Sequence, residues 1–186
     1  MNPPTTHFAL FDINGPDPSG QRHLTTASGY IKNLHTGAGG ALDFGTLDIS
    51  SGVIVDSPTK CVVWVVDDMG DATQKIFDMK FWICSTSDFV GLGTDYNVYF
   101  NQYITGMWHS GLKLTHSSGM YSSLSLPSGQ NLYKWDGVKE ITEAGTDNSV
   151  SQYIYLSVGV DPNIPVGIYG GDGTNGFRYR VTYKYL

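Results

Sequence analysis

The strict alternation of apolar and polar residues at the C-terminal end of the chain constrains its fold more than any other feature. Five apolar positions, Phe177, Tyr179, Val181, Tyr183 and Tyr185, alternate with Arg178, Arg180, Thr182 and Lys184. Because successive side chains of a strand point to opposite faces, this period of two predicts a half-buried β-strand. One face of that strand is aromatic and the other is solvated.

Two earlier segments predict further strands of different kinds. In residues 76–83, the side chains of Phe77, Met79, Phe81 and Ile83 share one face, and Asp78 and Lys80 lie opposite, which again indicates a half-buried strand. Residues 59–66 form a continuous β-branched run around Trp64. Such a run is typical of a central strand that is covered on both faces.

Residues that favour turns separate the remaining predicted strands. Glycine, proline and aspartate clusters recur about every 8–15 residues, a spacing that suits a sandwich or a jelly roll. Helix signals are almost absent, and residues 135–145 favour one short turn at most. The further predicted strands are His7–Ile13, Ala27–Leu34, Ala41–Leu47, Tyr96–Ile104, Gly111–His116, Asn131–Trp135 and Ser151–Val160.

The strands run through the whole chain without a change in composition. Its 186 residues suit one domain. We therefore predict an all-β fold over residues 1–186, an antiparallel β-sandwich that is immunoglobulin-like or a jelly roll, with little or no helix. Residues 1–6 form an N-terminal arm in this prediction, and residues 118–150 form a long polar excursion between strands.

Charge and hydropathy exclude several classes of partner. Charged residues make up 15% of the chain, against about 25% in an average soluble domain. The net charge of −6 argues against binding to the nucleic-acid backbone, and there is no apolar run of transmembrane length. We therefore expect neither a nucleic-acid nor a membrane partner. Residues 1–6 lack the pattern of a secretory signal, so we expect the protein to stay in the compartment where it is made, unless the sequence is a mature form.

Both cysteines, Cys61 and Cys84, lie in apolar stretches. One interpretation is a disulfide between two core strands, as some sandwich domains have. The alternative is a pair of buried thiols that act as small hydrophobic side chains. The missing export signal favours the thiols, because reducing compartments disfavour disulfides.

Catalytic motifs are not found in the sequence. The histidines are not spaced as an HExxH motif or a close metal pair, and there is no GxSxG sequence. Glutamate occurs only at positions 140 and 143, so a glycosidase pair cannot be selected. We expect no enzymatic activity, no catalytic residue and no cofactor. The five histidines are His7, His23, His35, His109 and His116.

Asp67, Asp68 and Asp71 cluster in one predicted hairpin loop. Carboxylates on a tight loop can bind calcium, which prefers oxygen ligands, so these three residues are the candidates for a metal site. Their spacing differs from that of an EF-hand. The alternative, which we favour, is an ordinary solvated turn.

The surplus of aromatic residues is the most informative feature for binding. Trp64 and Trp82 belong to strand cores by their pattern, whereas Trp108 and Trp135 lie among glycine, serine, histidine and aspartate. Together with Tyr121, the latter two are the candidates for stacking on sugars or for anchoring a protein interface. The alternative is that each of these tryptophans fills one end of the sandwich beneath a loop.

The C-terminal hairpin resembles that of immunoglobulin-like structural subunits. A Pro-x-Gly-x-Tyr sequence, residues 165–169, precedes the alternating strand that ends in tyrosine, as in spore-coat-U-like and pilus-type subunits. Residues 42–47, Leu-Asp-Phe-Gly-Thr-Leu, look like the early Phe-Gly strand of such domains. The resemblance implies a surface subunit. The chain departs from those secreted subunits in its cysteine placement and in lacking their signal sequence.

The composition is also similar to that of virion proteins. Low charge reduces the cost of desolvating a large surface, and interface cores are enriched in tyrosine, tryptophan and methionine. This analogy implies a subunit of a phage particle, such as a capsid decoration, neck or tail protein, assembled in the host cytoplasm. It would bind copies of itself and neighbouring shell proteins, with residues 105–122 and 127–150 as contacts. A glycan-binding sandwich module, and a pilus or spore-coat subunit at the cell surface, remain the alternatives.

Overall fold

The computed structural model describes residues 2–11, 30–34, 42–71, 75–84, 98–105, 120–122, 129–164, 166–167 and 178–186. Within these ranges the chain forms two antiparallel β-sheets and one 3-10 turn, η3 (Asp147–Ser149), with no α-helix. The same ranges hold no helix long and apolar enough to cross a membrane. The strand predicted at Gly111–His116 lies outside the described residues.

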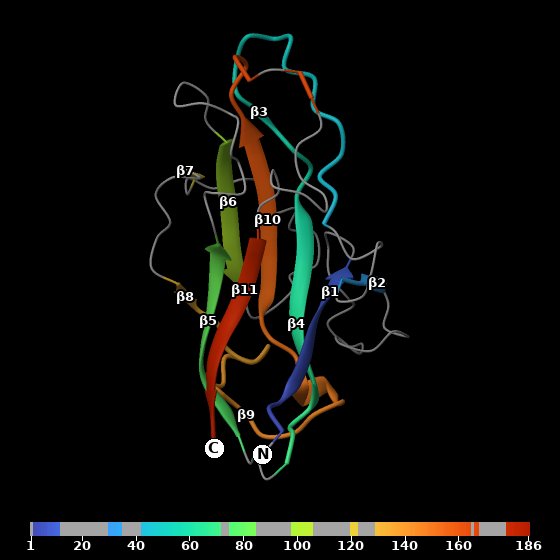
Figure 1. Ribbon diagram of the computed structural model, residues 1–186, viewed down its shortest axis with the longest axis vertical. Coiled ribbons are helices and arrows are strands. Elements are labelled where there is room, and N and C mark those ends of the chain that lie inside the picture. Colours follow the sequence, from blue (N-terminus) through green and yellow to red (C-terminus); the bar gives the residue numbers. More distant parts are fainter. Residues whose placement is uncertain are drawn as a thin grey trace.

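The larger sheet, sheet A, has the strand order β2-β1-β4-β10-β6-β7, and β3 also pairs with β10. Neighbouring strands are antiparallel throughout (Figure 1). The strands are β1 (Thr5–Phe11), β2 (Tyr30–Asn33), β3 (Val55–Asp56), β4 (Lys60–Asp68), β6 (Val98–Thr105), β7 (Met120–Ser122) and β10 (Tyr153–Val160).

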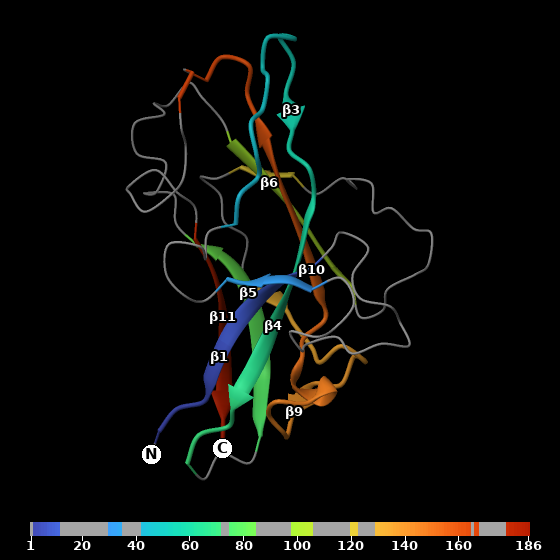
Figure 2. The ribbon, with the colours of Figure 1, turned by 90° about the vertical axis from the view of Figure 1, so that its right-hand side faces the viewer.

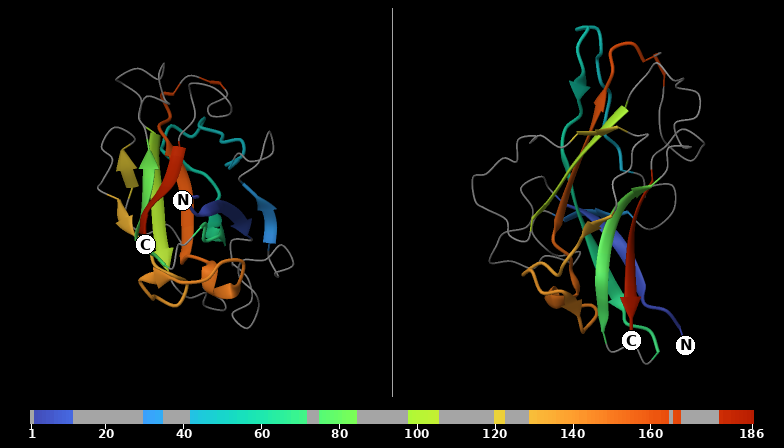
Figure 3. Two further views of the ribbon diagram at one scale, coloured as in Figure 1. Left: turned by 60° about the horizontal axis from the view of Figure 1, so that its bottom comes forward. Right: turned by 90° about the vertical axis from the view of Figure 1, so that its left-hand side faces the viewer.

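The smaller sheet, sheet B, is built around β5 (Ile76–Cys84), which pairs with β11 (Arg178–Tyr185) on one side. The short strands β8 (Gln130–Asn131) and β9 (Glu140–Ile141) also pair with β5. Sheet B lies in front of sheet A in Figure 1, and Figure 2 and Figure 3 show the same strands from other directions. The N and C ends lie at the same end of the molecule.

A continuous apolar core joins the two sheets. On sheet A it contains Val62, Trp64 and Val66 of β4, and on sheet B it contains Met79 and Phe81 of β5, all nearly inaccessible to solvent. Aromatic contacts extend this core toward β11. The ring centroids of Phe8 and Tyr179 are 4.8 Å apart, and those of Trp64 and Tyr183 are 5.2 Å apart. The predicted alternation of β11 is thus confirmed for Tyr179, Val181 and Tyr183. Tyr185, predicted on the same face, is 37% exposed at the end of the strand.

A second apolar cluster covers the opposite face of sheet A. Because it takes the alternate residues of β4 and β10, these two strands are buried on both faces, as the continuous run at 59–66 predicted. The cluster consists of Ala9, Phe11, Cys61, Val63, Val65, Val150, Tyr153 and Tyr155. Cys61 therefore faces away from β5, the strand that carries Cys84, whose side chain lies outside the described part of the structure.

The inward face of β5 differs from its prediction because of a bulge at Asp78. Asp78 has a φ of 54°, and the pairing with β11 shifts there: Thr182 faces Lys80, whereas Lys184 faces Phe77. The extra residue reverses the alternation on one side of the bulge. Ile76 is consequently the buried residue at this end, and the prediction that Phe77 points inward is wrong.

Residues 42–49 pack on the core without forming the strand predicted at Ala41–Leu47. The Asp43 Oδ1 accepts a hydrogen bond from the Gly45 amide at 2.7 Å, and Gly45 has a φ of 81°. This local turn breaks the extended backbone, since a positive φ is incompatible with a strand. The apolar side chains of the segment are still partly buried, and they are Leu42, Phe44, Leu47 and Ile49.

Two predicted loop regions contain residues that belong to the sheets. Within 118–150, Leu132, Ile141 and Val150 are fully buried. Within the first six residues, Thr5 and Thr6 pair with β4, and Pro4 is buried. These contacts fix residues 4–6 and much of 129–150 to the body of their own chain.

Candidate functional site

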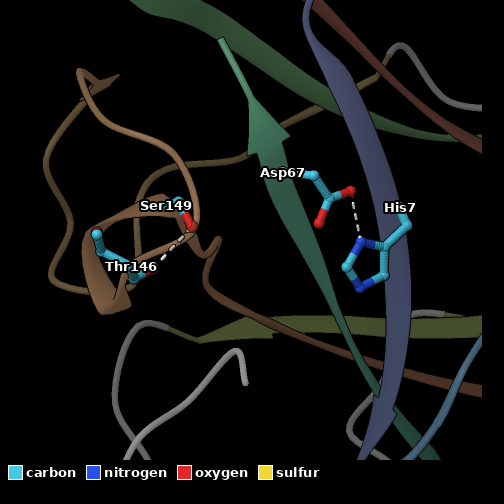
Figure 4. Close-up of polar contacts among 4 residues, drawn as sticks. All are labelled: His7, Asp67, Thr146 and Ser149. Atoms are coloured by element: carbon cyan, nitrogen blue, oxygen red, sulfur yellow. Dashed lines mark hydrogen bonds and ion pairs between the residues drawn. The ribbon is translucent and has the colours of Figure 1, made fainter. Parts of the chain in front are cut away.

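Two of the three predicted metal ligands of the β4–β5 hairpin, Asp67 and Asp68, have separate partners. The Nδ1 of His7 lies 2.7 Å from the Oδ2 of Asp67, which ties β1 to β4 (Figure 4). The Oδ1 of Asp68 accepts a hydrogen bond from the Gly70 amide at 2.8 Å, and Asp71 is exposed. In the part of the chain that the structure describes, no three histidine, cysteine or acidic side chains form a group that could hold a metal ion. These contacts support a solvated turn closed by an aspartate cap.

The other polar contact in Figure 4 stabilises η3. The hydroxyl of Ser149 donates to the Thr146 carbonyl at 2.7 Å, and the Thr146 hydroxyl accepts from the Asn148 amide at 3.2 Å. The Gly145 amide donates to the Val66 carbonyl at 3.1 Å, so this turn is fastened to the end of β4. These hydrogen bonds therefore cap η3 and fix its position beside β4.

The three aromatic residues predicted as a stacking surface are described only in part. Trp108 lies outside the described residues. Tyr121 is paired with Phe100 in the β6–β7 ladder, and its side chain is not among those described. Trp135 is half-buried, its indole nitrogen is inside the protein, and its amide donates to the Val150 carbonyl at 2.9 Å. This placement supports the interpretation that Trp135 fills space beneath a loop.

The outer face of sheet B presents a different aromatic group, which the sequence pattern assigned to the core. Trp82 points away from sheet A, because its neighbours Phe81 and Val181 face the core. Trp82 pairs with Arg180 of β11, and Lys80 pairs with Thr182 on one side and with Asn131 of β8 on the other. We call this surface the Trp82 face, and it consists of Lys80, Trp82, Gly129, Asn131, Arg180 and Thr182.

The indole of Trp82 is held by three neighbours. Its Nε1 donates a hydrogen bond to the Thr182 Oγ1 at 2.7 Å, and the Arg180 guanidinium carbon lies 5.8 Å from the ring centroid, within cation–π range. The ring also lies against Gly129, so closely that a Cβ at that position would collide with it. Glycine at position 129 thus provides the space that the ring occupies, while part of the indole stays exposed.

The cations near the Trp82 face are only partly neutralised. Lys184 Nζ lies 2.8 Å from the Oδ2 of Asp78, and this hydrogen bond and the charge of Lys184 hold the pKa of the Asp78 carboxyl below its usual range. Lys75 pairs with Glu140 at 3.1 Å. Among the described residues, Lys80 and Arg180 have no carboxylate at ion-pair distance. Within the described part of the chain, two positive charges without an ion-pair partner therefore lie next to Trp82, although Lys80 also feels the Asp78 carboxylate, whose pKa it helps to lower. The net charge of the chain is −6.

A signal for the Trp82 face is present in the sequence. Trp82 is two residues beyond Lys80 and four beyond Asp78, so the period of two places it on the polar side of its strand. The positions of Gly129 and Asn131 beside it depend on the pairing of β8 with β5, which no local pattern reveals.

Searches against family models, characterised proteins and solved structures find no match to this chain. What the protein does must therefore be inferred from its own residues. Two surfaces bear on that question: the Trp82 face, and an exposed apolar turn at the opposite end of the molecule from the termini.

Proposed function

We propose that the chain is a structural assembly protein, a subunit of a phage particle such as a capsid decoration, neck or tail protein. It acts by binding copies of itself and neighbouring shell proteins. The observation that carries this proposal is a pair of adjacent exposed apolar side chains. Val53 and Ile54 are 61% and 44% exposed in the turn that leads into β3.

A local hydrogen bond and a strand pairing hold the backbone on either side of this pair. The Asp48 Oδ1 accepts a hydrogen bond from the Ser50 amide at 2.9 Å, which also lowers the pKa of that carboxyl, and Gly52 has a φ of 70°. After the pair, β3 is fixed to β10 through two residue pairs. The turn lies at the end of the molecule away from both termini (Figures 1 and 2). It therefore presents its apolar side chains without a large loss of conformational freedom on binding.

A contact of this kind suits the composition of the chain. Burial of apolar surface favours association by about 25 cal/mol per Å² before the entropic cost of binding is subtracted, and the chain as a whole carries few charges. Val166, which follows β10, is 99% exposed and adds to the apolar residues near this end of β10. We include in the proposal that the two sheets form an immunoglobulin-like or jelly-roll sandwich. The contact of Trp64 with Tyr183 across the two sheets supports a face-to-face arrangement.

The self-association part is tested by light scattering over a range of protein concentrations. We expect the wild-type mass to rise to a defined multiple of 20.3 kDa. The double variant Val53→Ser/Ile54→Ser should associate at least about tenfold more weakly. Val138→Ser is the matched control, because Val138 is 47% exposed elsewhere on the surface.

The particle part needs a separate measurement. Mass spectrometry of purified phage particles that encode the chain should detect its peptides in a fixed ratio to the main shell protein. A wild-type protein that stays monomeric at every concentration, and that is missing from such particles, contradicts the proposal.

A further inference from the structure

The Trp82 face combines a restrained aromatic ring, two cations without an ion-pair partner among the described residues, and two small polar side chains on the outer side of sheet B. We propose that this face binds a carboxylated sugar. Trp82 stacks on the sugar ring, and Arg180 and Lys80 bind its carboxylate. This site differs from the three aromatic residues predicted from the sequence, and it does not depend on the proposed assembly role.

The stacking part rests on how the indole is positioned. The hydrogen bond to Thr182 and the contact with Gly129 restrain the ring before any ligand arrives. A restrained and partly exposed indole loses little freedom on binding, and its apolar face suits the C–H face of a sugar ring.

The charge part rests on the pairing register. Trp82 faces Arg180 and Lys80 faces Thr182, so Arg180 and Lys80 are diagonal neighbours, with Cα atoms about 7–8 Å apart. Both side chains can therefore reach one ligand that lies on Trp82. A guanidinium binds a carboxylate through two parallel hydrogen bonds, and an ammonium binds it as a point charge. Neither cation has a carboxylate within ion-pair distance among the described residues, and the Asp78 carboxylate, whose pKa Lys80 helps to lower, is itself paired with Lys184.

The two small polar residues supply the hydroxyl recognition that a sugar needs. The Thr182 oxygen accepts from Trp82, so its own proton is available to donate. Asn131 is exposed beside Lys80 and offers both a donor and an acceptor. Four kinds of polar group thus surround the indole on three strands.

The same charges disfavour a second copy of this chain as the occupant. Antiparallel pairing of two β11 strands about Thr182 would place Arg180 opposite Lys184 of the other copy. Like charges that are directly opposite destabilise a strand pair, and cations on an edge strand are a common protection against such pairing. An anionic ligand avoids this conflict.

The test is a calorimetric titration with tetragalacturonate, and with galactotetraose of the same linkage as the neutral counterpart. We expect tetragalacturonate to bind at least about tenfold more tightly than the neutral sugar, because only the former engages Arg180 and Lys80. Arg180→Gln and Lys80→Gln should each weaken binding by about three- to tenfold. Lys139→Gln is the control, since it removes the same charge from an exposed site outside the Trp82 face.

Gly129→Ala tests the stacking without altering the tryptophan. The added methyl group displaces the ring, and we expect binding to fall at least about tenfold while the circular dichroism spectrum stays that of the wild type. If Gly129→Ala does not fold, Trp82→Phe gives the same test by reducing the stacking area.

Four outcomes overturn the proposal. The first is that the wild type binds no oligomer of galacturonate, guluronate or sialate up to about 10 mM. The second and third are that the Arg180→Gln variant, or the variant that removes stacking, binds tetragalacturonate as tightly as the wild type. The fourth is that the wild type binds polyglutamate of the same length as tightly as tetragalacturonate. The last result would identify a general surface for acidic polymers.

Discussion

β4 and β11 pass through the same core but use their side chains in opposite ways. Every side chain from Cys61 to Val66 in β4 is buried, because apolar clusters cover both faces of sheet A. β11 packs Tyr179 and Tyr183, both partly buried, against the core but turns Arg180 and Lys184 to solvent. β4 therefore contributes to stability alone, whereas β11 also builds a surface. If strand residues of this protein bind a ligand, we therefore expect the ligand on the outer face of sheet B.

The largest expected effect is at Trp64 of β4. Trp64→Ala should lower the free energy of unfolding by about 3–5 kcal/mol, because it leaves a cavity between the sheets. Urea denaturation followed by circular dichroism measures this change. Trp82→Ala on the outer face is the matched control and should cost clearly less. Equal losses would contradict the outward placement of Trp82.

The buried phenol of Tyr179 is expected to give the next largest effect. Burial raises its pKa from 10.0 to about 12, so the folded state binds its proton more tightly than the unfolded state. The resulting stability is fully present below pH 10 and is lost as the pH rises to about 12, a change of about 2–3 kcal/mol. The difference in unfolding free energy between the wild type and Tyr179→Phe, measured from pH 9 to 12, isolates this group. A pH-independent difference would disagree with the burial.

A smaller effect is expected on the second face of β4. Val63→Thr keeps the shape of the side chain but places a hydroxyl among Phe11, Cys61 and Val65, and it should cost about 1–3 kcal/mol. Thermal and urea unfolding measure it. If the variant is as stable as the wild type, β4 is covered on one face only, and the contrast with β11 disappears.

The smallest effect is expected at Lys184, on the solvated face of β11. Lys184→Gln removes an exposed ion pair, so the stability at pH 7 should stay within error of the wild type. The pKa of the Asp78 carboxyl should rise toward its usual value, because Lys184 is the main cause of its lowering. NMR titration of the carboxyl follows this change. Since that pKa is lowered in the folded state, any stability from the pair is present above the usual aspartate range and is lost as the pH falls through the lowered pKa.

Strands with an unbroken pattern could be predicted from the sequence alone. β4 is a continuous apolar run and the described part of β11 alternates strictly, so local residues decide which faces are buried. β5 could not be predicted fully, because the positive φ of Asp78 inserts a bulge that hydrophobicity does not reveal. Residues 42–49 also look like a strand, but the Asp43 side chain stabilises a turn instead.

The candidate surfaces were less predictable than the strands. Trp82 forms part of a candidate binding surface only because Gly129, next to β8, and Arg180 of β11 lie beside it in the fold. These residues are 47 and 98 positions away along the chain. Long-range pairing of this kind has no local signature. The exposure of Val53 and Ile54 could not be predicted either, because apolar residues in a strand-rich chain are more often buried.

The position of the two chain ends has a practical consequence. Leu186 is hydrogen-bonded to Lys75 through both of its backbone groups, and the N-terminal strand begins at the same end of the molecule (Figure 1). A reporter or purification handle joined to either terminus would therefore emerge on the side remote from the turn at Val53. Labelled copies of this protein can be prepared in that way without obstructing the turn.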